Sequence, residues 1–460
     1  MLYHALIITL YASIQAGLCT IISLIIGLIV AYFVWRYQCP GYTYIHALLY
    51  MYSCMPTKAA ALAVNVCYGA HGMVSITIAL LMLNIPYATV IMQQAYTAHL
   101  DYESIDVAAE FGASSWQWYK DIALPQLAPA IQQSARMIFT LCFCSLSFCP
   151  ILGNQWYHAT PEGMMQNAYY TNNTNALALY AILRIVILGI VWSNGFLHEQ
   201  RSSISMPIDN PRIHQPTRLP NMGAWTIILL LLLLLIPCTK LLQHGIHHGM
   251  LAYWRALIRG NHDPHLALPA LRAVYNSIFV ACCSSIIALG ISYILCAIST
   301  LYPAHIYSVL AFPFCVGSVG CSLMCTALAS TSWLCGWPAL IISHALLNYP
   351  YAYYLIKPHY QQYSRELVAT AQTYGASRWY IFVTITAPLL WPAVRCALCI
   401  CFSLSITEVG ATTTMHTLPT MACAIKIYKN ATYDAGSIGM TCIVCVLAYS
   451  VAFLGNTSMY

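Results

Sequence analysis

The sequence has very few charged residues for its length. Of 460 residues only 7% are Asp, Glu, Lys or Arg, whereas 60% are hydrophobic. An ordinary soluble domain has about 25% charged residues, so this composition excludes a soluble globular protein. The net charge of +6 therefore does not indicate a nucleic-acid partner, because in a membrane protein the informative quantity is where the basic residues fall between spans.

Catalytic motifs are also missing. The chain has no G-x-x-x-x-G-K-[ST] phosphate-binding loop, and no lysine directly follows a glycine. It has neither H-E-x-x-H nor G-x-S-x-G, and no predicted span holds two carboxylates at catalytic spacing. The sequence therefore predicts a protein that is not an enzyme, with no catalytic residue and no cofactor.

The 21 cysteines form no recognisable framework. They are scattered through apolar segments, and the two C-x-x-C spacings, Cys396/Cys399 and Cys442/Cys445, lie inside predicted membrane spans. Small residues that pack between helices are the simpler interpretation, against a metal or redox site. Neither a metal site nor a disulfide pattern is predicted.

Long uncharged runs are what the sequence has in abundance. Crossing about 30 Å of hydrocarbon takes roughly 20 helical residues, and a backbone in lipid must satisfy its own hydrogen bonds. The runs predict an all-α polytopic membrane protein with about eleven spans. The first run is too long for a cleaved signal and is predicted to be retained. The predicted spans are 5–35, 44–67, 73–96, 128–152 and 176–197, then 223–242, 270–299, 305–329, 336–357, 389–413 and 435–455.

A polar segment separates the two groups of spans. Residues 198–221 contain prolines and arginines without an apolar period, which is typical of a linker, so residues 1–197 and 222–460 are predicted to form two halves. The side richer in Lys and Arg is predicted to be cytoplasmic, with the linker and the carboxyl terminus, and the amino terminus outside. The richer side holds Arg36, Lys120, Arg136, Arg201, Arg212, Arg218, Lys357, Arg365, Arg378 and Arg395, against Lys58, Lys240, Arg255, Arg259, Lys426 and Lys429.

The two halves share an internal repeat. The segment "LNIPYA" at 83–88 returns as "LNYPYA" at 347–352, and "VAAEFGASSWQWYKDIALP" at 107–125 has a relative, "VATAQTYGASRWYIFVTITAP", at 368–388. Both copies run in the same direction through the predicted spans. Such a parallel duplication predicts two halves that face each other across an axis normal to the membrane.

The longer repeated segment is half polar in an otherwise apolar chain. Each copy has a glycine, Gly112 or Gly375, followed thirteen residues later by a proline, Pro125 or Pro388. Glycine closes helices in the left-handed conformation and proline suits the first turn of a helix. Each copy therefore predicts a short helical hairpin outside the membrane, shaped to fit a groove on another protein. The alternative is a pair of helices that lie flat on lipid headgroups, but lipid binding does not require the matched spacing.

The same residues carry a specific resemblance. "D-V-A-A-E-F-G", nine residues and "I-A-L-P" resemble the E-A-A-x-x-x-G-x9-I-x-L-P loop of the permease subunits of binding-protein-dependent ABC importers. In layout the chain is similar to the fused two-half permeases for thiamine and ferric iron, and residues 137–153 and the "TLP" at 417–419 are most similar to the thiamine branch. The matching residues are Asp106, Ala108, Gly112, Ile122, Leu124 and Pro125 in the first copy and Ala371, Gly375, Ile385 and Pro388 in the second, where Ala369 replaces the acidic residue.

This resemblance implies an ABC importer type I permease fold in a bacterial inner membrane. In that family the loop is a coupling helix that docks into the ATPase subunit, and the first half usually has one more span at its amino end. The implied partners are two copies of an ABC ATPase subunit at the cytoplasmic face, a periplasmic or extracellular solute-binding protein and membrane lipid, without nucleic acid. The implied solute is a small cation, thiamine first and ferric iron second. A self-sufficient secondary transporter or channel is the alternative, but it assigns no function to the two hairpins.

Candidate residues for a solute path lie inside the predicted spans. A carboxylate within a span is costly and tends to face a cavity or a cationic partner, so Glu408 is the first candidate; pairing with Arg184, or a place at a helix end in water, is the alternative. Asn84 and Asn348 each precede a proline break and are candidates to expose backbone carbonyls to a pore. A hydrogen bond between helices is the alternative for both asparagines.

A histidine-rich segment lies on the predicted outer side. It contains His244, His247 and His248, and later His262 and His265. Metal capture would favour the iron interpretation. The spacing fits no defined ligand set, however, and a solvated loop explains it equally well.

Overall fold

The computed structural model shows a helical protein. It describes residues 2–37, 45, 48–49, 52, 55–69, 72–100, 103–146, 148–153, 159–193, 221–260, 265, 269–299, 303–329, 336–415 and 420–456, and no strand occurs among them. The predicted all-α fold is therefore confirmed. The linker up to residue 220, the "TLP" at 417–419 and His262 lie outside the described residues.

Helices of the first half alternate between long membrane helices and short segments that join them. The long ones are separated by the hairpin of α5, α6 and the π-helix η1, and by the short α8 and α9. The bounds are α1 (Leu2–Arg36), α3 (Thr57–Tyr68), α4 (Met73–His99), α5 (Glu103–Glu110), α6 (Ser115–Trp118), η1 (Tyr119–Ala123), α7 (Leu124–Phe143), α8 (Cys149–Leu152), α9 (Pro161–Tyr170) and α10 (Thr174–Ser193).

The second half repeats this order after two further helices, α11 and α12. The bounds are α11 (Asn221–His247), α12 (Met250–Ile258), α13 (Ala270–Ser299), α14 (Pro303–Ala329), α15 (Trp337–Thr373), α16 (Arg378–Ile381), η4 (Phe382–Thr386), α17 (Ala387–Thr407), α18 (Gly410–Met415), α19 (Met421–Asn430) and α20 (Asp434–Asn456).

Each predicted span contains a helix, and within the described residues seven helices are long and apolar enough to cross a membrane. Two predicted spans, 128–152 and 389–413, were wrong at their ends. α7 stops at Phe143 and α17 at Thr407, and the chain turns before it continues as α8 and α18. The apolar run does not mark these breaks because the segment beyond them stays buried, as α18 does along its whole length.

Helix α1 shows how the bundle packs. Its exposed side carries large aliphatic residues, as expected of a face turned to lipid, whereas its buried side carries small ones such as Ala12 and Ala16. At Gly27 the helix approaches α4 so closely that an added Cβ would lie 2.7 Å from the Cβ of Ala88. Small residues let membrane helices approach in this way. The exposed residues are Leu2, Leu6, Leu10, Ile14, Leu18, Ile21, Ile25 and Ile29.

The internal repeat is visible in backbone detail. The α9–α10 and α19–α20 pairs begin at Thr160 and Thr420, whose hydroxyls cap their helices by accepting N–H bonds. The turns inside these pairs place Asn172 at φ of 53° and Thr432 at φ of 55°. Two non-glycine residues in the left-handed conformation at matching positions are a strong mark of duplication, because this conformation is uncommon for residues with a side chain.

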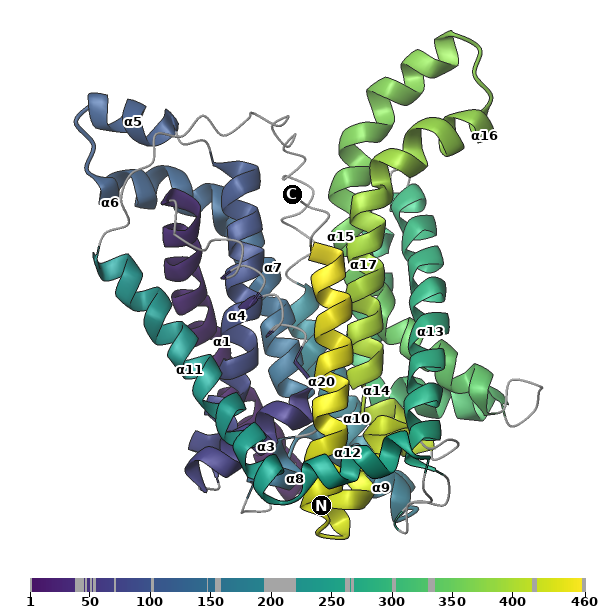
Figure 1. Cartoon of the computed structure of the whole chain (residues 1–460). Coiled ribbons are helices and arrows are strands. Elements are labelled where there is room, and N and C mark those ends of the chain that lie inside the picture. Colours follow the sequence, from purple (N-terminus) through teal and green to yellow (C-terminus); the bar gives the residue numbers. More distant parts are fainter. Residues whose placement is uncertain are drawn as a thin grey trace.

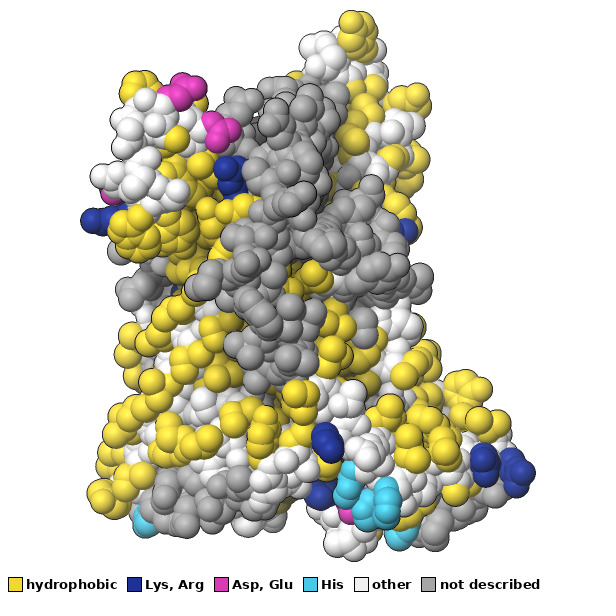
Figure 2. All heavy atoms as spheres, turned by 60° about the vertical axis from the view of Figure 1, so that its left-hand side comes forward, with side chains coloured by type: hydrophobic (Ala, Val, Ile, Leu, Met, Phe, Trp, Pro, Cys, Tyr) yellow, Lys and Arg dark blue, Asp and Glu magenta, His cyan; other side chains and the backbone are white. Residues whose placement is uncertain are grey.

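The two hairpins stand at the same end of the molecule and the amino end of α1 lies at the other (Figure 1). This agrees with the predicted topology. Figure 2 shows charged and histidine side chains gathered at the two ends, with hydrophobic side chains between them, as expected of a protein that spans a membrane. The halves touch where α9 and α10 pack against α14, and where α3 packs against α11 and α20.

Candidate functional site

The first copy of the repeated segment folds as a helix–turn–helix hairpin. α5 ends at Glu110, and Gly112 takes the left-handed conformation with φ of 78°. The N–H of Ala113 donates to the carbonyl of Ala108 at 2.9 Å, and the N–H of Gly112 donates to that of Ala109 at 2.9 Å. These two bonds are the Schellman pattern that ends a helix. The predicted glycine turn is confirmed.

A buried tryptophan anchors this hairpin to the membrane helices. Trp118 is 2% exposed, its ring stacks on Trp35 of α1 with centroids 6.3 Å apart, and its Nε1–H donates to Ser104 of α5 at 3.1 Å. The second arm starts with a capping box between Ser114 and Gln117. One ring thus ties both arms of the hairpin to α1.

The outer surface of the hairpin is apolar and open. Phe111 is 87% exposed and Trp116 is 69% exposed, which is unusual for aromatic residues away from the lipid-facing surface. Asp106 is also exposed, with its carboxylate 3.9 Å from Arg36, an ion pair of little energetic weight at this exposure. Ala108 faces inward instead, at 8% exposure.

The second copy has the same turn. Gly375 has φ of 79°, and the N–H of Ala376 donates to the carbonyl of Ala371 at 3.1 Å. Ser377 accepts a bond from the N–H of Tyr380 at 3.3 Å, at the position that Ser114 has in the first copy. The two predicted hairpins are therefore equivalent in backbone geometry.

The hairpins differ in how they join the membrane helices. In the first half α4 ends at His99 and α5 is a separate helix that lies across the bundle, whereas α15 runs without a break from Trp337 to Thr373 and carries its hairpin beyond the bundle (Figure 1). The predicted span 336–357 thus covers only the first part of α15. In both copies a π-helix of five residues leads to a proline in the first turn of the next helix. Leu124, Pro125 and Pro388 lie exposed at this junction.

The two asparagines proposed for a solute path hold helices together. Asn84 donates to the carbonyl of Leu80 at 2.8 Å and to the sulfur of Cys142 at 3.3 Å, and Asn348 donates to the carbonyl of Cys401 at 3.2 Å. Both side chains are buried. They join α4 to α7 and α15 to α17 in the described state, as the alternative interpretation expected, and a role on a solute path stays a prediction.

Glu408 lies at the break between α17 and α18. Its carboxylate accepts bonds from the N–H groups of Gly410 at 2.7 Å and Ala411 at 3.3 Å, so it caps the amino end of α18. It borders a small pocket of about 10 Å³, which has room for one water molecule. The alternative that placed this residue at a helix end in water is met in its position at a helix end, whereas its carboxylate bonds backbone N–H groups at a small pocket between helices.

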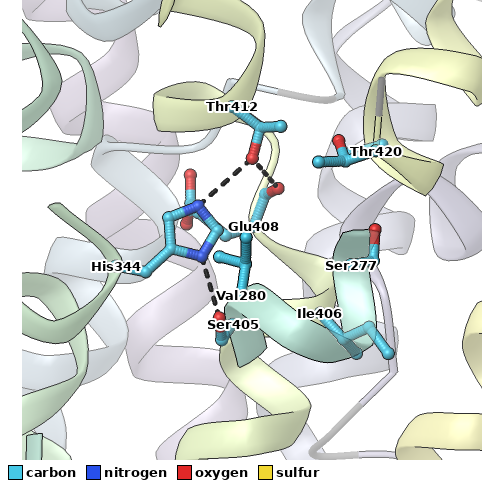
Figure 3. Close-up of a pocket in the computed structure, with 9 residues that line it drawn as sticks. Ser277, Val280, His344, Ser405, Ile406, Glu408, Thr412 and Thr420 are labelled. Atoms are coloured by element: carbon cyan, nitrogen blue, oxygen red, sulfur yellow. Dashed lines mark hydrogen bonds between the residues drawn. The ribbon is translucent and has the colours of Figure 1, made fainter. Parts of the chain in front are cut away.

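A buried histidine lies in the same pocket. His344 of α15 bonds Ser405 at 2.8 Å through Nδ1 and Thr412 at 3.2 Å through Nε2, and Thr412 donates to the backbone carbonyl of Glu408 at 3.0 Å (Figure 3). The pocket brings together α13, α15, α17 and α18. The sequence analysis did not identify His344. A polar residue inside a predicted span is costly and therefore a functional candidate, and this rule would have found it.

Pairing between Glu408 and Arg184 was the wrong alternative. Arg184 of α10 forms an ion pair with Glu162 of α9, and both side chains are almost fully buried, at 2% and 1% exposure. Glu162 falls between the predicted spans 128–152 and 176–197, where the sequence predicts no buried charge. It is buried because α9 folds back against α14.

The histidine-rich segment forms no metal centre within the described residues, where no group of three His, Cys, Asp or Glu side chains is close enough to hold a metal ion. The rings of His244 and His248 lie 4.2 Å apart between centroids. Burial lowers the pKa of His244, and the neighbouring His248 lowers it further.

The second half of the chain matches a known family, and the chain has several curated relatives. Residues 269–456 match the family described as "Binding-protein-dependent transport system inner membrane component". The thiamine transport system permease protein ThiP of Escherichia coli is 25% identical over 264 residues, covering 51% of this chain and 48% of ThiP. The molybdate/tungstate permease WtpB of Thermococcus kodakarensis is 23% identical over 159 residues, covering 34% and 63%. The molybdenum permease ModB of Haemophilus influenzae is 37% identical over 78 residues, covering 17% and 34%.

These matches span about a third to just under two thirds of each relative's own length. Together with the seven apolar helices they identify a multi-pass protein of inner-membrane type. The family is one of transport components, which agrees with the absence of catalytic motifs from the sequence.

Proposed function

This chain is a relative of the permease subunits of binding-protein-dependent ABC importers, and we propose that it is the transmembrane permease of such an importer, in a bacterial inner membrane. It moves a small solute inward by alternating access, driven by a separate ATPase. The observation that carries this proposal is the pair of matched, glycine-closed hairpins at one end of a duplicated bundle. Two copies of the ATPase subunit bind the hairpins, and a soluble solute-binding protein delivers the solute at the opposite end.

The anchoring of the first hairpin supports a mechanical role. An amphipathic helix that merely lies on lipid needs no closed turn and no fixed link to a membrane helix. Here Trp118 links the hairpin to α1, and the exposed Phe111 and Trp116 offer an apolar surface to a partner. Movement of the two ATPase subunits toward each other would draw the hairpins together and rock the two halves.

For the solute we propose a small cation, with thiamine before ferric iron. The thiamine permeases match the greatest lengths of this chain among the relatives described, with 264 residues for the Escherichia coli protein and 306 for the Salmonella typhimurium protein. The molybdate, molybdenum and sulfate permeases match shorter parts, between 78 and 159 residues. Glu408 supplies a negative charge within the bundle, which suits a cation.

Two measurements test the function. The tagged chain, purified from its own membranes in mild detergent, is expected to bring an ATPase with it, and proteoliposomes of that complex are expected to take up solute only when ATP is on the ATPase side. Uptake by the purified chain alone, driven by an ion gradient, would instead show a secondary transporter. A thermal-shift screen of the matching solute-binding protein against thiamine, ferric iron and molybdate identifies the solute.

A further inference from the structure

Helix α14 is broken near its middle. Gly317 has φ of 74° and ψ of −178°, which interrupts the helix inside the bilayer. A break of this kind frees backbone groups that a membrane cannot hydrate. The buried ion pair satisfies two of them: Arg184 donates to the carbonyl of Phe314 at 3.1 Å, and Glu162 accepts from the N–H of Val319 at 2.7 Å.

The break and the ion pair fit each other closely. A Cβ on Gly317 would collide with the guanidinium of Arg184. The guanidinium therefore fits at this position only because the residue is glycine. Ser318 adds a hydroxyl bond of 2.9 Å to the same carboxylate oxygen of Glu162. Arg184 lies midway along α10 and Gly317 midway along α14, so this contact lies near the middle of two helices that are long and apolar enough to span a membrane.

The contact joins the two halves, because α9 and α10 belong to the first half and α14 to the second. One face of α9 forms this contact between the halves. Beyond Glu162, Gln166 donates to Thr413 at 2.8 Å, and one turn further Tyr170 donates to the backbone carbonyl of the same Thr413. The spacing of four residues keeps all three side chains of α9 on one face.

The equivalent contact across the pseudo-twofold axis differs in charge. Among the described residues it has no ion pair, and Lys58, at the start of α3, donates to the carbonyl of Ala422 in α19 at 3.1 Å. Ala422 has the position of Glu162, and Val444 has that of Arg184. The buried ion pair therefore has no charged counterpart at these two positions of the repeat.

We propose that Glu162 and Arg184 are the lock of a gate, which holds the two halves together at mid-membrane while the hairpins are apart and must leave α14 in each transport cycle. The inference rests on the proposed function for its place in the cycle. Figure 1 shows the hairpins apart at one end while α9 and α14 pack together away from them. Closure of the hairpins would rock the halves about the bundle and open this contact.

The composition of the lock suits repeated opening. Both charges belong to the first half, so they travel together and stay paired when α14 moves away. An ion pair divided between the halves would leave two bare charges in the membrane, which is far more costly. For the ion pair itself, opening this contact breaks hydrogen bonds to Val319, Ser318 and Phe314 and no charge pairing. Water entering the opened gate replaces these bonds, and those from Gln166 and Tyr170 to Thr413.

The test measures the separation of the hairpins in the purified chain, in lipid nanodiscs without ATPase or nucleotide. Fluorophores are attached through p-azidophenylalanine in place of Phe111 and Tyr374, both 87% exposed, and single-molecule energy transfer reports the fraction of molecules with the hairpins close together. Ser318→Ala removes the hydroxyl that bonds Glu162 and that also bonds the Glu408 side chain within the second half, and it changes no charge. The double variant Glu162→Gln/Arg184→Gln removes both charges together. Asp434→Asn, which alters an exposed pair with Lys429, is the matched control.

Wild type and the control are expected to show the hairpins apart. Ser318→Ala is expected to raise the close fraction by about tenfold, the effect of losing one charge-assisted hydrogen bond, and the double variant by more. An unchanged distribution in Ser318→Ala, with wild-type thermal unfolding, overturns the proposal, as does a wild type with its hairpins already close. Because no ATPase is present, this result is independent of the test of the proposed function.

Discussion

The substitution Gly112→Val tests whether the first hairpin transmits force. Gly112 has φ of 78°, and a Cβ there would meet no atom within 4 Å, so the cost comes from the backbone alone. For a residue with a side chain the left-handed conformation costs about 1–2 kcal/mol of free energy, and a β-branched residue lies at the upper end of this range. That makes the native turn about 5 to 30 times less populated. The hairpin is exposed and local, so the membrane helices stay folded while the docking shape is lost.

The assay is ATP-driven uptake by proteoliposomes that contain the chain and its ATPase, and the expected result for Gly112→Val is a loss of about tenfold or more. Gly112→Asn is the control at the same site, since asparagine tolerates this conformation. Gly69→Val is the control for strain elsewhere, because Gly69 ends α3 with φ of 56° and equally free surroundings. Wild-type uptake in Gly112→Val would refute the coupling role, and so would equal losses in Gly112→Val and Gly69→Val.

Three further predictions concern packing and capping. Gly27→Ala is expected to lower the free energy of unfolding by about 1–3 kcal/mol, because the added Cβ overlaps Ala88. Thermal unfolding in detergent measures this loss, and Gly17→Ala, whose Cβ would have no atom within 4 Å, is the control that should not destabilise the protein. Trp118→Ala removes the anchor of the first hairpin and should make that hairpin sensitive to protease while the bundle resists; an intact hairpin would contradict the anchoring. Glu408→Gln should weaken the cap of α18 by up to about 2 kcal/mol and reduce thiamine uptake, and full uptake would remove Glu408 from the path.

The hairpins were predictable because their information is local. A left-handed turn requires glycine, and a first helical turn accepts proline, so Gly112 and Pro125 fix the turn and the start of α7 by their own backbone limits. The same pattern with Gly375 and Pro388 predicts the second copy. The long α15 was not predicted to its end, because its last four turns leave the apolar span without a residue that stops a helix.

The breaks inside the bundle were harder to predict. α17 ends at Thr407 in the middle of an apolar stretch. The hydrogen bonds that Glu408 accepts from the first N–H groups of α18 show where the chain turns. Hydropathy measures the cost of burial and is nearly the same on both sides of such a break. In α14 the break falls at Gly317, one of several glycines in the spans. The sequence does not single it out because the group that occupies the space beside it is the guanidinium of Arg184, from a helix distant in the sequence.

The position of the buried charges shows what a repeat can and cannot predict. Duplication preserves the backbone, as Thr160 and Thr420 show by capping equivalent helices. The backbone of one half therefore predicts that of the other. It does not preserve charge, since Glu162 has an alanine as its counterpart. Pairing of Arg184 with Glu408 was only one of the alternatives for that carboxylate, and the structure instead pairs Arg184 with Glu162, which a short helix outside the predicted spans brings to it. In a membrane protein an unpaired buried arginine therefore predicts that a carboxylate will reach it, and short helices between spans have to be searched for that carboxylate as well as the spans themselves.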